Sequence, residues 1–424
     1  MGLIISKLRP AKAKVRMTSG FDYHCLSKVF HKIMSLNTGN RMTAVNWKQL
    51  REEFQTLAHW TYLDTARKTV PPRCQERAMQ DYCLDIRETA GVEAWSATQV
   101  AETREVMARL LGAKPAEIAF TKNTTEGLNI AAHAFDLKPG DNIVLTDMEH
   151  VANVWVWKHW EQRGVEIRYA KNRNGRLPLE VFLEQMDQRT RVVSTAYITY
   201  GNGYRVNLSE LGVACRAHGA RLVVDGVQAA GILAAPLGSL GADIIAIGGH
   251  KNLLGLTGLG LLYCREELVD QIRTPFLKAP VAQGSAQASA HLKSQFDYVR
   301  TAHRFEGGNP NFLGLRVLRD SAAFIESIGL QNIEERVREL STYCMAQLKA
   351  AGLPVLTPEP WLERAQIVSF AAPEAGGLMD VLREKHRVIV NVKDGAIRVS
   401  MSFFNNEEDI DRLLAALLEE RVAA

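Results

Sequence analysis

Short apolar runs alternate with helical stretches through the middle of the chain. The expected strands span 143–145, 165–169, 192–200, 221–224, 243–247 and 260–263, and the expected helices span 179–186 and 208–218. Strands that alternate with helices indicate βαβ units and a mostly parallel sheet with helices on both faces. Ligands of such sheets bind beyond the carboxyl ends of the strands. The pattern therefore predicts an α/β fold with a site at that edge.

The chain changes character after Asn309-Pro310. The expected elements beyond it are helices 313–328, 333–348, 377–385 and 407–418 and strands 367–370, 388–392 and 396–401. Those before the alternating region are a helix over 47–57, an extended segment over 62–66 and a helix over 102–111. We predict a large domain over 42–310, whose N-terminal segment packs on the small domain. A connecting helix and a small C-terminal α/β domain follow over 311–424.

The composition is that of a soluble protein with a substantial core: 46% of residues are hydrophobic and 23% are charged. No apolar run approaches the ~18–20 residues of a membrane span. The six cysteines form no C-x-x-C pair, which favours reduced cytoplasmic thiols over a disulfide framework or a zinc site. We expect no metal, no membrane partner and a cytoplasmic enzyme.

The formal net charge of +4 comes from one end of the chain. Residues 1–41 hold eight Lys and Arg and a single acid, which leaves 43 basic and 46 acidic residues elsewhere. The mildly acidic body argues against nucleic-acid binding. We expect residues 1–41 to be a basic extension that is disordered or outside the fold. Three other interpretations stay open: an organelle transit peptide, N-myristoylation at Met1-Gly2, and a chain that starts at Met42.

Three chemically useful features follow expected strands or precede an expected helix. Asp225 ends one strand, and Gly248-Gly249-His250-Lys251 follows the next strand. Thr124-Thr125-Glu126-Gly127 precedes a helix expected to start near Leu128. A desolvated lysine can bond a carbonyl, a carboxylate can keep a pyridine nitrogen protonated, and a helix start can bind phosphate.

Each feature alone also fits a structural role, as a turn residue, a solvated lysine or a helix cap. Together, an open α/β sheet would gather them at one edge. The glycine-rich run 255–260 does not indicate dinucleotide binding, because its spacing is wrong and a strand follows it.

These motifs resemble the class V aminotransferase superfamily of fold-type I pyridoxal-phosphate (PLP) enzymes, which includes cysteine desulfurases, selenocysteine lyases and isopenicillin-N-epimerase-like proteins. The resemblance runs from about Tyr62 to the C-terminus. Its core is residues 223–229 and 249–251, with Gly255 and Thr257-Gly258 beyond. It implies a seven-stranded, mostly parallel sheet in the large domain.

The resemblance also implies roles for individual residues. Lys251 is similar to the lysine that forms a Schiff base with PLP, Asp225 to the partner of the pyridine nitrogen, and Gln228 to the residue that hydrogen-bonds the ring hydroxyl. His150 resembles the histidine stacked on the ring. Thr124, Thr125 and His250 resemble phosphate ligands.

Two further roles concern the substrate and the partner subunit. Arg398 resembles the arginine that grips the substrate carboxylate, a task that suits a bidentate guanidinium. Asn309 resembles a phosphate ligand donated by the other subunit, which implies a homodimer with shared active sites.

Departures from the family bear on the substrate. Many relatives have Ser where Gly248 stands, so one phosphate hydroxyl is missing, and the position of Asn309 is usually Thr. Tyr197 and Tyr200 stand where desulfurases often have His and Asn. Tyr200 fits a place near the substrate and equally a buried structural role. Residues 390–396 form a tight turn without the cysteine that relays persulfide in many desulfurases.

The resemblance implies chemistry through an external aldimine and a Cα carbanion, with Lys251, His150 and Asp225 as the catalytic residues. Our leading hypothesis is a cysteine-desulfurase-like carbon–sulfur lyase that acts on a small amino acid without a relay cysteine. An aminotransferase or an epimerase acting on another amino acid is the alternative. A non-catalytic binding protein on the same fold is a further one.

Overall fold

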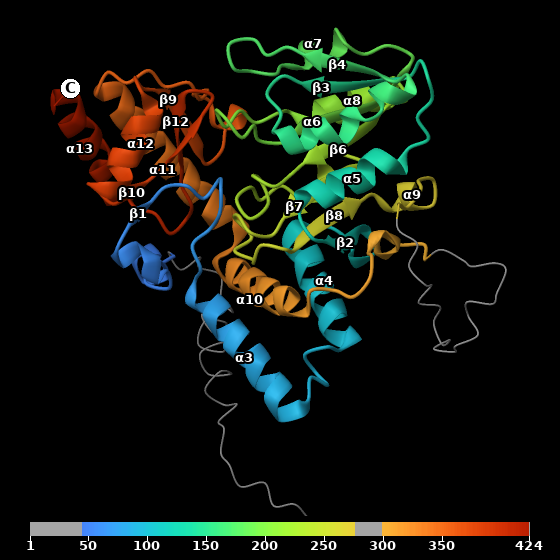
Figure 1. The fold of residues 1–424 in the computed structure, drawn as a ribbon, viewed down its shortest axis with the longest axis horizontal. Coiled ribbons are helices and arrows are strands. Elements are labelled where there is room, and N and C mark those ends of the chain that lie inside the picture. The colour runs from blue at the N-terminus through green and yellow to red at the C-terminus, as the bar shows by residue number, and fades with distance from the viewer. Residues whose placement is uncertain (1–44, 276–298, 424) are drawn as a thin grey trace, which may run out of the picture. The chain divides into compact units, whose positions relative to one another are not determined.

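A seven-stranded sheet forms the centre of the computed structural model (Figure 1). Its strands in spatial order are β2 (Ile118–Thr121), β8 (Gly260–Cys264), β7 (Ile244–Gly248), β6 (Arg221–Asp225), β5 (Thr190–Ala196), β3 (Asn142–Thr146) and β4 (Glu166–Ala170). β8 runs antiparallel to β2 and β7, and the other neighbours pair in parallel. The predicted α/β fold with a mostly parallel seven-stranded sheet is confirmed.

The structure describes residues 45–275 and 299–423. The predictions for residues 1–41, including the transit peptide, the N-myristoylation site and the basic extension, lie outside these ranges, and so does Met42. No helix among the described residues is long and apolar enough to cross a membrane.

Both faces of the central sheet are buried, because neighbouring residues of a strand point to opposite sides. Val223 and Ala246 belong to one apolar cluster, which includes Trp157. Val224 and Ile245 belong to another, which includes Met107. The helices of this part of the chain are α3 (Arg73–Thr89), α4 (Ala97–Leu111), α5 (Thr124–Ala134), α6 (Val151–Lys158), α7 (Leu179–Leu183), α8 (Leu208–Ala217) and α9 (Glu266–Val269).

A second, antiparallel sheet lies in the C-terminal part, in the order β11 (Asn391–Lys393), β12 (Ala396–Ser400) and β9 (Ile367–Ala371). The helices of this part are α10 (Phe312–Ile328), α11 (Leu330–Ala350), α12 (Ala375–Glu384) and α13 (Glu407–Ala423). β1 (Thr61–Tyr62) pairs with β10 (Val388–Ile389). An Arg51–Asp409 ion pair of 2.7 Å also links α2 (Trp47–Arg51) to this part. The domain division at residue 310 stays a prediction.

Several expected elements differ in extent. The helix expected over 47–57 ends at Arg51, and the strand expected over 192–200 ends at Ala196. The strand expected over 388–392 is divided between β10 and β11, which belong to different sheets. α3 was not predicted from the sequence; Gln75 and Ala78 are its buried residues. The 3₁₀ helices are η1 (Gln55–Ala58), η2 (Pro115–Glu117), η3 (Glu161–Arg163), η4 (Leu237–Ser239), η6 (Ala302–Phe305) and η7 (Trp361–Glu363).

The helix expected near Leu128 begins earlier, at Thr124. Asn123 caps it by accepting a hydrogen bond of 2.9 Å from the Glu126 N–H. Thr124 and Thr125 are therefore the first residues of α5 and do not precede it. Free N–H groups at a helix start are suited to binding an anion, so this correction strengthens the phosphate interpretation.

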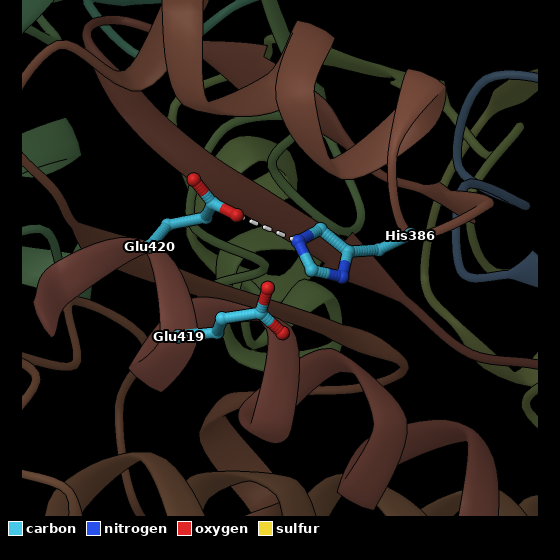
Figure 2. Close-up of side chains that lie close together, drawn as sticks. All are labelled: His386, Glu419 and Glu420. Atoms are coloured by element: carbon cyan, nitrogen blue, oxygen red, sulfur yellow. Dashed lines mark hydrogen bonds and ion pairs between the residues drawn. The ribbon is translucent and has the colours of Figure 1, made fainter. Parts of the chain in front are cut away.

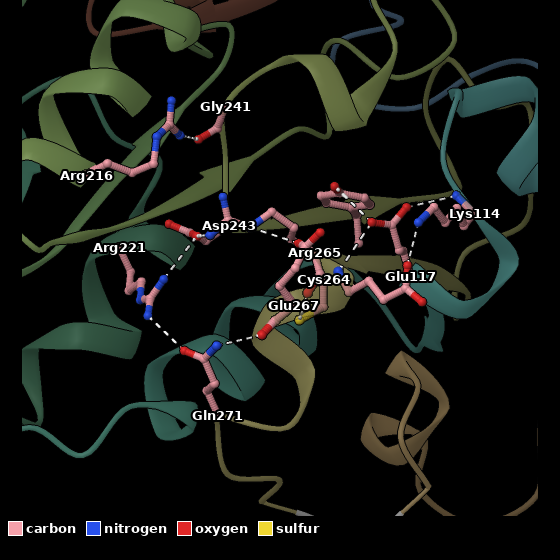
Figure 3. Close-up of polar contacts among 12 residues, drawn as sticks. Lys114, Glu117, Arg216, Arg221, Gly241, Asp243, Cys264, Arg265, Glu267 and Gln271 are labelled. Atoms are coloured by element: carbon pink, nitrogen blue, oxygen red, sulfur yellow. Dashed lines mark hydrogen bonds and ion pairs between the residues drawn. The ribbon is translucent and has the colours of Figure 1, made fainter.

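Asp243 connects the amino ends of β6 and β7, and Figure 3 shows it with Arg221 and Arg265. This buried carboxylate accepts hydrogen bonds from the Leu222 N–H at 2.8 Å and from Arg265 at 2.5 Å. Arg221 lies 3.6 Å away. Asp243 thereby connects β6, β7 and the residue after β8. The candidate site lies at the opposite, carboxyl ends of the parallel strands.

Candidate active site

Asp225 and Lys251 lie at the carboxyl edge of the sheet. Asp225 ends β6 and is buried, and its carboxylate accepts a hydrogen bond of 3.0 Å from the Val227 N–H. Burial lowers the pKa of Lys251 to about 8, and the Asp225 carboxylate partly offsets this effect. Burial also raises the pKa of Asp225, which the Lys251 charge opposes. Lys251 is therefore still mostly protonated at pH 7, but its neutral fraction of about a tenth is far above that of a lysine with the ordinary pKa of 10.5.

Thr124 and His250 meet across Gly248, the last residue of β7. A Cβ on Gly248 would lie 2.9 Å from Thr124 Oγ1 and 3.0 Å from His250 Cε1. Burial, Lys251 and Lys68 lower the pKa of His250 to about 4, so its ring is neutral. Thr125 is exposed in the same first turn of α5. These hydroxyl and imidazole groups, with the N–H groups of the turn, have the chemistry to hold a phosphate.

Gln228 is buried beside this edge. Its amide nitrogen donates to the Ala66 carbonyl at 2.9 Å. Its Oε1 is buried and has no hydrogen-bond partner among the described residues. A buried polar atom without a partner is costly, so Gln228 has the capacity to bind a ligand atom.

His150 caps α6, and its Nδ1 accepts a hydrogen bond of 3.2 Å from the Ala152 N–H. The ring proton therefore resides on Nε2. The ring meets Tyr200 edge-on, with 5.3 Å between ring centroids. Partial desolvation and the charges of Lys251, Lys393 and Arg398 lower the pKa of His150. His150 is thus a neutral ring near the Lys251 amine.

Arg398 lies in β12 and is 2% exposed. It donates to the Tyr200 carbonyl at 2.9 Å and to the Asp64 carboxylate at 3.1 Å. Its Nε is buried and has no partner among the described residues. Arg398 and Asp64 both act on the pKa of Lys251, which puts this ion pair close to the lysine amine.

Tyr197 and Asn309 have fewer contacts with the other candidate site residues. Tyr197 is buried; its hydroxyl accepts a hydrogen bond from Arg205 at 3.2 Å, and its N–H supports the Asp225 carbonyl. These contacts indicate a structural role. Asn309 is exposed just after η6, and no contact joins it to the other candidates among the described residues.

Sequence reasoning missed two buried acids, Asp64 and Glu149. Glu149 accepts hydrogen bonds from the Thr146 hydroxyl (2.8 Å), the Asn153 amide (2.8 Å) and the Ala196 N–H (3.1 Å). Burial raises its pKa to about 7. Its position directly before His150 was the available signal. Asp64 gave none, because its partner Arg398 is 334 residues away.

One group of possible metal ligands lies away from this site, at the end of α13 (Figure 2). Among the described residues, His386, Glu419 and Glu420 are the cluster with suitable spacing, and His386 Nε2 lies 2.8 Å from Glu420. The Lys385 ammonium lies 2.6 Å from Glu419 and 2.8 Å from Glu420. Because the Lys385 ammonium is paired with both carboxylates, the cluster is a surface ion-pair network.

Comparisons with known proteins agree with this arrangement. Residues 61–413 match the model of the family described as aminotransferase class-V. The cysteine desulfurase of Cronobacter sakazakii is 28% identical over 403 residues, which cover 88% of this chain and 97% of that protein. A solved apo structure of cysteine desulfurase from Thermococcus onnurineus has a TM-score of 0.80 at 27% identity and covers 89% of this chain and 98% of its own.

A further solved structure shows the same fold. It is a complex between the cystine C–S lyase C-DES and its reaction product, cysteine persulfide. Its TM-score is 0.78 at 22% identity, and the match covers 86% of this chain and 98% of that one.

Proposed function

This chain belongs to the aminotransferase class-V family, and we propose that it is a cysteine-desulfurase-like carbon–sulfur lyase acting on cysteine or a related small amino acid. It is an enzyme, and its cofactor is pyridoxal phosphate, as in the PLP-linked structures of the same fold. The observation that carries the proposal is the position of Asp225 and Lys251 at the carboxyl ends of the paired strands β6 and β7, where burial lowers the pKa of Lys251 to about 8. The similarity to cysteine desulfurases supports the substrate class.

The residues at the edge of the sheet fit this cofactor. The neutral amine of Lys251 would bond its aldehyde, and the buried Asp225 would hold a proton at its ring nitrogen. Gln228, whose Oε1 lacks a partner, would meet the ring hydroxyl. Thr124, Thr125 and His250 would hold the phosphate, and the neutral ring of His150 would stack on the cofactor. The close packing around Gly248 supports a cradle in which backbone N–H groups act in place of an additional hydroxyl.

The chain's own residues handle the substrate. When bound, pyridoxal phosphate supplies an electron sink for bond cleavage next to Cα. Arg398 would bind the α-carboxylate through its buried Nε, with Tyr200 beside it. Lys251, released from the cofactor, would take the Cα proton, since a pKa of about 8 suits a general base near neutral pH.

We further propose that no cysteine of the described residues relays the sulfur. β11 and β12 are joined by Asp394-Gly395, both with positive φ as in a type I′ turn, and this hairpin contains no cysteine. Cys215, Cys264 and Cys344 are buried, and burial raises each thiol pKa to about 12. Cys74 and Cys83 both lie on α3. The released sulfur would therefore leave as sulfide or stay on the product.

A homodimer with shared sites is part of the proposal. Asn309 is exposed and in no contact with the site residues of its own chain among the described residues. Its exposure is compatible with donation of a hydrogen bond to the phosphate in the partner's site. Sedimentation of the cofactor-loaded enzyme would test whether the dimer exists.

The experiment that tests the function is a visible spectrum of the loaded enzyme together with a substrate screen. Borohydride reduction followed by peptide mapping should find the cofactor on Lys251. The reduced cofactor adduct should be absent from Lys251→Ala. It should remain in Lys158→Ala, which replaces a lysine on α6. Cysteine should give sulfide, pyruvate and ammonia by β-elimination, or alanine and sulfane sulfur that an added thiol reduces to sulfide. Cystine should give cysteine persulfide, pyruvate and ammonia. Amino-group exchange, or α-deuterium loss without β-cleavage, would instead establish an aminotransferase or an epimerase.

A further inference from the structure

Arg398 and Asp64 form a buried ion pair inside the candidate site. The side chains are 2% and 0% exposed, and Arg398 Nη2 lies 3.1 Å from Asp64 Oδ1. Arg398 Nη1 donates to the Tyr200 carbonyl at 2.9 Å. The guanidinium is thus fixed at both terminal nitrogens by groups from two different parts of the chain.

These two contacts decide which donors of Arg398 remain free. A guanidinium has five N–H donors in one plane. Asp64 and Tyr200 each use one donor on a terminal nitrogen, which leaves Nε–H and one hydrogen on each terminal nitrogen. Nε is buried without a partner among the described residues. A buried unpaired donor next to a free Nη hydrogen is the arrangement that binds a carboxylate in a bidentate manner.

Asp64 is itself held in place. Its Oδ2 accepts a hydrogen bond of 2.9 Å from the Asn391 amide, and Asn391 is the strand partner of Arg398. The Asp64 backbone forms a bridge with Ser400. Arg67 lies 3.9 Å away with a side chain that is 63% exposed, so it is a loose neighbour. The carboxylate therefore has one close cationic partner, Arg398.

We propose that Asp64 is a positioning residue that presents the Nε edge of Arg398 to the α-carboxylate of the substrate. The inference rests on the proposed function and extends it, because it names the group that sets the recognition of α-amino acids over simple amines. The N-terminal segment then belongs to the site, although it is far from Lys251 in the sequence. A substrate without a carboxylate gains nothing from Asp64.

The test compares cysteine with cysteamine, which lacks only the carboxylate. Their apparent dissociation constants are read from the early change in the visible absorption of the loaded enzyme, before turnover. Asp64→Asn should raise the apparent dissociation constant of cysteine by about ten- to a hundred-fold, the loss expected for a charged hydrogen bond. The apparent dissociation constant of cysteamine should change by less than about two-fold, because cysteamine has no carboxylate. Equal weakening of both ligands, or of neither, overturns the inference.

Asp409→Asn is the matched control. Asp409 is also a buried aspartate paired with an arginine, Arg51, and it joins the same N-terminal segment to the C-terminal part. It lies outside the site. Its loss should lower the melting temperature and leave the ratio of the two dissociation constants unchanged. A change in that ratio would show that the ratio reports stability, and the inference would be abandoned.

Asn391→Ala serves if Asp64→Asn does not fold. It removes the second support of Asp64 and leaves the charge pair intact, so it should weaken cysteine selectively, by a smaller factor. An unchanged ratio in this variant overturns the inference. A wild-type enzyme whose spectrum responds to neither ligand would instead overturn the proposed function.

Discussion

Gly248 and Thr124 approach each other so closely that a Cβ on Gly248 would lie 2.9 Å from Thr124 Oγ1. The contact joins the end of β7 to the first turn of α5, the two elements that form the proposed phosphate cradle. It gives a physical reason for the glycine where many relatives have serine, because a side chain here would require the Thr124 or His250 side chain to shift.

Gly248→Ser should therefore weaken cofactor binding, although it adds a hydroxyl. Overpacking of this kind costs about 1–3 kcal/mol. The measurement is a titration of the cofactor-free protein followed by visible absorption. Gly376→Ser, at an α12 glycine with open space around its Cβ position, is the control and should bind normally. Normal binding by Gly248→Ser would show that the cradle relaxes.

The rate of cofactor attachment should follow the neutral form of Lys251. Burial lowers the pKa of this lysine from 10.5 to about 8, so the attachment rate should rise with pH and level off above about pH 8. Asp225→Asn removes a charge that favours the ammonium form and should move the midpoint to lower pH. The rate is followed by absorbance after mixing with pyridoxal phosphate. A midpoint near 10.5 would contradict the burial effect.

The same pKa predicts a change in stability. Between pH 8 and 10.5 the unfolded chain binds more protons at Lys251 than the folded chain does. The free energy of unfolding of the cofactor-free protein should therefore rise with pH across this window. Lys251→Met should reduce the slope, as measured by urea denaturation at several pH values. An identical slope in both proteins would assign the effect to other groups.

Sulfide release should survive the loss of both thiols on α3. Cys74→Ser and Cys83→Ser, alone and combined, should keep their rates within about two-fold, because Cys83 is exposed and burial raises the pKa of the half-buried Cys74 thiol to about 11. Sulfide is measured with cysteine as substrate under reducing conditions. A rate lost in either variant, with the fold intact by circular dichroism, would indicate a relay cysteine on α3.

Shared sites predict complementation between two inactive variants. Lys251→Ala lacks the cofactor lysine, and Asn309→Ala should retain the cofactor poorly. A mixed dimer would contain one site with Lys251 from one subunit and Asn309 from the other. Co-expression with random pairing should then restore about a quarter of the activity of an equal amount of wild-type enzyme, since half of the dimers are mixed and one of their two sites is intact. If mixing restores nothing, Asn309 serves its own chain or is dispensable.

The sequence alone predicted the sheet and most of its strands, because each buried strand is a local apolar run bounded by turn residues. The order of Asp225 and Lys251 after successive strands also placed them at one edge, since parallel strands end on the same side. Element boundaries were less certain, as the early start of α5 at Thr124 shows.

Only the tertiary structure decided which distant side chains contact one another in the candidate site. The pairing of Asp64 with Arg398 joins residues 334 positions apart, and the crowding at Gly248 depends on how α5 packs on the sheet. Neither leaves a periodic pattern along the chain, because both arise from packing between distant segments. The sequence therefore determined which groups are available, and the folded chain decided which donors of Arg398 have a partner among the described residues.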